Sequence, residues 1–144
     1  MNEKGFTMLE IMLVMTVIVI ATALTMPIYQ AFQPKNDIEV ASTAVANGAR
    51  RAQILSQASN MDSAWGIKIE TGKVIVFKGD SYEMRDQEED EIFEIAKNIS
   101  ISGITEIVFS KTFGMPNPSG EIILRSINND IKTININEKG TVSY

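Results

Sequence analysis

The sequence predicts an α+β protein in which a long amino-terminal helix packs, through its second half, on an antiparallel β-sheet domain. An apolar run over residues 11–26 predicts the first half of the helix, and small and apolar residues at three- and four-residue spacing predict the second half. Beyond residue 59, apolar residues alternate with polar ones between turn sequences, which predicts strands. The stripe expected to face the sheet consists of Ile38, Ala41, Val45, Gly48, Ala52 and Leu55.

We expect four segments along the chain: a polar leader (1–5), an apolar helix (6–26), a continuation of that helix (27–58) and a β-rich head (59–144). A length of 144 residues with 44% hydrophobic content suits one compact domain and one membrane span. Residues 6–26 would span about 30 Å as a helix, which matches a hydrocarbon core. The amino terminus and Lys4 give the leader positive charge, so the leader is expected in the cytoplasm and the head outside it.

Glu10 is the one acid inside the predicted span. A carboxylate deep in a bilayer costs about 2.5 to 3.5 kcal/mol and less near the interface, so such a residue is a functional-site hypothesis that needs a cationic partner. The nearest available cation is an amino terminus, either of the same chain or of a neighbour.

The residues Lys4-Gly-Phe-Thr-Met-Leu-Glu10, followed by an apolar helix, resemble the class III leader of type IV pilins and type II secretion pseudopilins. The resemblance implies that a prepilin peptidase cuts between Gly5 and Phe6 and methylates the new terminal amine of Phe6. It also implies that Glu10 guides assembly of a filament through the amino-terminal helix. The implied partners are this peptidase and methyltransferase, other pilin subunits, a membrane assembly platform and the membrane itself, and no catalytic residue, metal or cofactor is implied.

Two other interpretations of the amino terminus stay open. In an ordinary secretory signal peptide, Ala21-Thr-Ala23 would imitate the cleavage site and the mature chain would begin at Leu24. A plain membrane anchor would explain the length of the apolar run, but it leaves Gly5 and Glu10 without a role.

Two prolines, Pro27 and Pro34, follow the apolar run. Within a continuing helix each would leave the carbonyl four residues earlier without its donor, which predicts a kink or a break. Pilins often carry a proline at the place of Pro27. The alternative is a linker at the membrane exit, followed by a second helical section capped by Asn36 or Asp37.

The head is expected to contain a hairpin and several later strands. Residues 65–69 and 73–77 flank the turn Thr71-Gly72. The later strands are expected over residues 104–110, 121–126, 131–137 and 141–144, separated by glycine-, proline- and asparagine-containing turns.

The charged residues give weaker signals. The run Asp86-Gln-Glu-Glu-Asp-Glu91 is expected in a solvated loop, and binding of a divalent cation by its carboxylates is the alternative. Asn98-Ile-Ser100 fits the glycosylation sequon, but so short a pattern is a weak signal, and the end of a strand facing solvent explains it better. Arg50 and Arg51, beside the apolar stripe, are expected to be solvated.

Composition argues against an enzyme. Without histidine or cysteine, the chain has neither a Ser-His-Asp nor a Cys-His arrangement, and a zinc site is not expected. No phosphate-binding glycine loop is present. The net charge of −5 is unchanged by loss of the leader, which removes one base and one acid, and an acidic chain is a poor nonspecific ligand for DNA.

The carboxyl-terminal quarter resembles the GspH/FimT group of minor pilins and pseudopilins. The matching residues are Phe109, Gly114, Gly120, Ile122, Leu124, Ile134, Ile136, Gly140 and Val142. Some members of that group bind DNA through arginines near the carboxyl terminus, whereas this chain ends Gly140-Thr-Val-Ser-Tyr144 without a base. The expected function is therefore a structural, minor subunit of a pilus or pseudopilus. The alternative is a tip subunit that binds DNA or a surface, for which Lys111, Arg125, Lys132 and Lys139 would have to form one basic patch.

Overall fold

The computed structural model describes residues 5–58 and 62–144, with only the backbone described for residues 24–31. The chain forms two compact units, Met1–Gln33 and Pro34–Tyr144. Helix α1 (Met8–Gln57) is one continuous α-helix. The expectation of a break or linker at the prolines is therefore wrong.

The prolines do not end α1 because each removes only one backbone donor, while residues on both sides continue the helix. Pro27 lies in the stretch whose side chains are outside the description, and a kink near Pro27 or Pro34 stays a prediction. Asn36 and Asp37 lie inside the helix and cap nothing. Asp37 instead accepts a hydrogen bond from Asn98 Nδ2 (3.2 Å), at the entrance to a strand.

Two antiparallel sheets pack on α1, where the sequence predicted one. Sheet A has the order β3-β2-β1-β5-β6 and sheet B the order β4-β7-β8-β9. The strands of sheet A are β1 (Trp65–Glu70), β2 (Lys73–Lys78), β3 (Asp86–Glu94), β5 (Glu106–Phe109) and β6 (Pro116–Asn117). Those of sheet B are β4 (Ser100–Gly103), β7 (Gly120–Arg125), β8 (Ile131–Ile136) and β9 (Val142–Ser143). The chain passes between sheets at Ile104 and Thr105, because β4 pairs with β7 and β5 pairs with β1.

The predicted strands are present, with bounds that differ by one or two residues, and the hairpin is confirmed. β1 and β2 pair from Glu70↔Lys73 to Trp65↔Lys78 around the two-residue turn, in which Gly72 has a φ of +86°. Three strands were missed: β3, β4 and β6. Prediction failed at β3 because its charged residues lack alternation, and only pairing with β2 makes this segment a strand.

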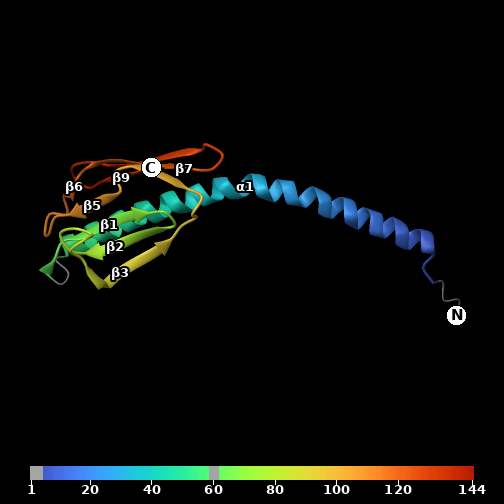
Figure 1. Cartoon of the computed structure of the whole chain (residues 1–144), viewed down its shortest axis with the longest axis horizontal. Coiled ribbons are helices and arrows are strands. Elements are labelled where there is room, and N and C mark those ends of the chain that lie inside the picture. Colours follow the sequence, from blue (N-terminus) through green and yellow to red (C-terminus); the bar gives the residue numbers. More distant parts are fainter. Residues whose placement is uncertain (1–4, 59–61) are drawn as a thin grey trace. The chain divides into compact units, whose positions relative to one another are not determined.

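One hydrophobic core joins α1 to both sheets. All six residues of the predicted stripe are buried, and Ala46 and Ala49 widen it. Small residues let the strands approach closely: a Cβ atom at Gly48 would lie 3.3 Å from Val74 Cγ1. Figure 1 shows β2 and β3 along one side of this part of α1 and β7 and β9 along the other.

Ser56 ties the end of α1 to sheet A. Its buried hydroxyl oxygen accepts a hydrogen bond from Trp65 N–H (2.8 Å), and the hydroxyl donates to the Phe109 carbonyl (3.0 Å). One side chain therefore holds the first residue of β1 and the last residue of β5.

We predict that Ser56→Ala lowers the free energy of unfolding by about 1 to 3 kcal/mol, because it takes one hydrogen-bond partner from buried backbone groups. Ser42→Ala is the matched control, since Ser42 is equally buried on α1 but, among the described residues, its hydroxyl donates to the Glu39 carbonyl of its own helix and to no strand. Urea unfolding of the full chain in mild detergent, followed by fluorescence of the single tryptophan, Trp65, measures both. Equal effects of the two substitutions would contradict the role of Ser56.

Candidate functional site

Thr7 starts helix α1. Its side-chain Oγ1 accepts a hydrogen bond from Glu10 N–H (3.2 Å), and its carbonyl accepts one from Ile11 N–H (3.2 Å). Thr7 is thus the N-cap, and Glu10 is the third helical residue. The pattern Thr-x-x-Glu is a capping-box signature that was readable in the sequence and was missed there.

This cap places the Glu10 carboxylate in the first turn, where the partial positive charge of the helix amino terminus favours an anion. Phe6 and Glu10 line the same shallow hollow of about 220 Å³, together with residues from the next turns of α1. The side chain that would begin a processed chain and the predicted assembly acid therefore lie together.

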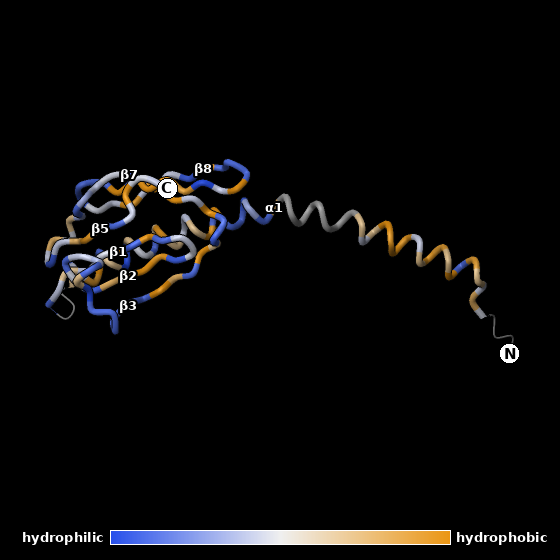
Figure 2. Tube along the Cα trace, in the orientation of Figure 1, coloured by the Kyte–Doolittle hydropathy of each residue, from blue (hydrophilic) through white to orange (hydrophobic). Residues whose placement is uncertain are grey.

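The described part of α1 before residue 24 exposes apolar side chains around its whole circumference. They include Leu9, Ile11, Leu13, Val14, Met15, Val17, Ile18, Val19 and Ile20. Figure 2 shows this segment as predominantly hydrophobic. Within the part of the chain that the structure describes, no helix reaches the length and apolarity needed to cross a membrane. The last three residues of the predicted span, 24–26, lie outside the described side chains.

The four basic residues proposed for a DNA-binding patch do not come together. Lys111 forms an ion pair with Asp62, and Lys132 with Glu39 (2.8 Å). Lys132 lies opposite buried Leu124 in the β7–β8 ladder, so both residues are on the face of sheet B that meets α1. Arg125 is one position further along β7 and therefore lies on the opposite face.

Lys139 follows β8 in the turn to β9, at the opposite end of the strand from Lys132. Its carbonyl accepts a hydrogen bond from Gln53 Nε2 (3.1 Å), so its backbone is fixed to α1. The patch that would support DNA binding is therefore not assembled by the fold.

The acidic run lies in β3 and not in a loop. Three of its carboxylates bind basic side chains: Asp86 with Lys78 (3.4 Å), Asp90 with Arg85 (2.9 Å) and Glu91 with Arg51 (2.9 Å). Among the described residues, no group of acidic side chains is arranged to hold a metal ion.

The two arginines beside the stripe are exposed, as expected, but both make contacts. Arg50 Nη2 donates to the Val142 carbonyl (3.3 Å), and its guanidinium lies 5.5 Å from the centroid of the Tyr144 ring. Arg51 donates a hydrogen bond to the Glu91 carboxylate, and this bond raises the pKa of Arg51. The exposed face of α1 is therefore bridged to β9 on one side and to β3 on the other.

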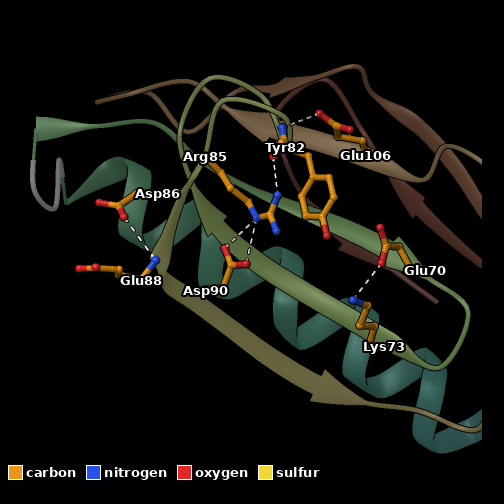
Figure 3. Close-up of polar contacts among 8 residues, drawn as sticks. All are labelled: Glu70, Lys73, Tyr82, Arg85, Asp86, Glu88, Asp90 and Glu106. Atoms are coloured by element: carbon orange, nitrogen blue, oxygen red, sulfur yellow. Dashed lines mark hydrogen bonds and ion pairs between the residues drawn. The ribbon is translucent and has the colours of Figure 1, made fainter.

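A polar cluster on the outer face of sheet A was missed by the sequence analysis (Figure 3). The loop between β2 and β3 lays Tyr82 edge-on against Phe77, with 5.6 Å between ring centroids. The Arg85 guanidinium lies 3.8 Å from the Tyr82 centroid, and its Nε donates to both carboxylate oxygens of Asp90. No periodic pattern marks these residues, because a loop brings them together.

Glu106 fastens this loop to β5. Its carboxylate accepts hydrogen bonds from Tyr82 N–H (3.0 Å) and Lys68 Nζ (3.1 Å). Burial raises the pKa of Glu106, but these two hydrogen bonds and the charge of Lys68 outweigh burial, and the net pKa lies below the ordinary value.

We predict that Glu106→Gln lowers the free energy of unfolding by about 1 kcal/mol at pH 7, allowing for partial solvent screening. A carboxylate whose pKa is lowered by folding stabilises the fold above its unfolded pKa of about 4.3, and this stabilisation is lost as the pH falls through the lower folded value. The difference between parent and variant should therefore shrink below about pH 4. Urea unfolding at stepped pH measures it, with Glu121→Gln as an exposed control on β7. A pH-independent difference would contradict the role of ionised Glu106.

Comparison with known proteins identifies the amino-terminal segment. Residues 1–26 match the family model for the prokaryotic N-terminal methylation motif. No match was found among curated proteins or among solved structures. The motif implies processing by prepilin peptidase and a location at the membrane or in a pilus, and proteins that carry it are structural subunits, not enzymes. The chain therefore carries the class III prepilin leader that type IV pilins and pseudopilins share.

Proposed function

We propose that this protein is a structural, minor subunit of a type IV pilus or a type II secretion pseudopilus. The observation that carries the proposal is the methylation motif, which runs directly into a continuous helix of 50 residues. The exposed apolar surface at the start of that helix needs a covering of lipid or of other helices. The inner membrane supplies lipid before assembly, and the filament supplies other helices afterwards.

In this proposal, prepilin peptidase cuts between Gly5 and Phe6 and methylates the amine of Phe6. The chain is then a single-pass membrane protein with the head outside the cytoplasm. Assembly uses an ion pair between the Glu10 carboxylate and a terminal ammonium of Phe6, from the same chain or from a staggered neighbour. A low-dielectric environment strengthens such a pair, which then fixes the register of packed helices.

Membership of the GspH/FimT group is part of the same proposal. Four of its matching residues, Ile122, Leu124, Ile134 and Ile136, form the buried face of β7 and β8. They support a β-rich pilin head. The dispersed basic residues give no support to the alternative, a tip subunit that binds DNA.

We predict that the mature protein begins at Phe6 with a methylated amine, which mass spectrometry of the amino-terminal peptide measures. Gly5→Val should keep the leader, because a side chain there hinders the peptidase. Among the described residues beyond its chain neighbours, a Cβ atom at Gly5 would meet nothing within 4 Å, so the substitution does not disturb the packing of the subunit. A mature start at Leu24 would establish an ordinary signal peptide and refute the filament proposal.

We predict that Glu10→Val leaves cleavage and membrane localisation intact but strongly reduces co-purification with other pilins and the number of filaments, because the ammonium of Phe6 loses its partner. Glu10→Asp, which keeps the charge, should retain part of the assembly. Filament counts and co-purification measure both. Normal assembly of Glu10→Val would refute the pairing and leave Glu10 with only its place in the helix cap.

A further inference from the structure

Strand β3 leaves one backbone edge of sheet A open. It is the terminal strand, and among the described residues it pairs only with β2. Ile95 N–H donates to the Gly72 carbonyl (3.0 Å), so the backbone groups of residue 95 point toward the β1–β2 hairpin. Because these groups alternate along a strand, those of Glu91 and Phe93 also point toward β2. The N–H and C=O groups of Ile92 and Glu94 therefore point away from the sheet.

The side chains along this edge combine apolar surface with negative charge. Ile92 is 57% exposed and Phe93 38% exposed. Asp86, Asp90 and Glu91 have basic partners within the chain. Within the described part of the chain, no ion pair is seen for Glu88, Glu89 and Glu94 of β3, of which Glu88 and Glu94 are exposed and Glu89 is half-buried.

The length of the usable edge is limited. Register between β3 and β2 is regular from Val76↔Glu91 to Lys73↔Glu94, and it shifts between Val76 and Lys78. Residues 87–90 of β3 lie opposite a single residue of β2, Phe77. They therefore form a bulge, which disturbs the pairing of the two strands. An added strand would thus find regular backbone groups only beside residues 91–94.

We infer that the open edge of β3 binds a short extended segment of another protein chain that carries lysine or arginine at alternate positions. Such a segment would hydrogen-bond to Ile92 and Glu94 as an added strand, with a basic side chain beside the exposed carboxylate of Glu94, the acid of residues 91–94 for which no ion pair is seen among the described residues. A second copy of β3 does not fit, because acids would face acids across the new pair. The inference does not depend on the proposed filament function.

The test uses the full chain in mild detergent and a labelled probe peptide of alternating lysine and valine. A peptide of alternating glutamate and valine is the charge control. We expect the basic peptide to bind and to slow hydrogen exchange at the amides of Ile92 and Glu94. The acidic peptide should not bind.

Ile92→Pro removes an outward N–H without removing a donor to β2, so the sheet tolerates it. It should weaken binding of the basic peptide by about tenfold or more. Ile92→Val keeps the N–H and the branched side chain, and it should bind like the parent. Hydrogen exchange at core amides shows whether each variant is folded.

If Ile92→Pro does not fold, Glu94→Lys provides an independent test, because it changes only an exposed side chain. It should weaken binding of the basic peptide. Binding that both Ile92→Pro and Glu94→Lys leave unchanged, or protection of another edge in place of β3, would overturn the inference.

Discussion

Close packing of two sheets against one face of α1 is the constraint on which the rest of the head depends. Most buried positions in the described part of this helix are alanine, glycine or serine, and Gly48 lies beneath Val74, so the strands of sheet A come close to the helix backbone. Larger residues on this face would separate the sheets from the helix. Ser56 then sets how β1 and β5 lie against the helix end, since it bonds to both.

This arrangement leaves one face of α1 uncovered, between the edge strands β3 and β9. Arg51 reaches from that face to Glu91 on β3, and Arg50 reaches to the carboxyl-terminal residues. The exposed ion pair between Arg51 and Glu91 contributes little to stability. The effect of the two arginine contacts is to hold the two sheet edges beside the helix, and it is the edge at β3 that stays open for another strand.

At the other end of α1, one short sequence serves two purposes. Thr7 caps the helix, and the cap places Glu10 in the first turn beside Phe6. The same carboxylate therefore suits both the start of the helix and the proposed pairing with a terminal ammonium. Conservative replacement of Glu10 distinguishes these roles, because aspartate can keep the charge while changing its reach.

The sequence by itself determined the leader, the long helix, its small-residue stripe and the hairpin around Gly72. These features depend on local pattern: a motif of contiguous residues, helical spacing and a two-residue turn. The features that depend on contacts between residues far apart in the sequence were decided by the tertiary structure alone. It made a strand of the acidic segment through pairing with β2, divided the strands between two sheets, and placed Lys132 and Arg125 on opposite faces. The helix also continues through Pro27 and Pro34, where the loss of single hydrogen bonds does not end it.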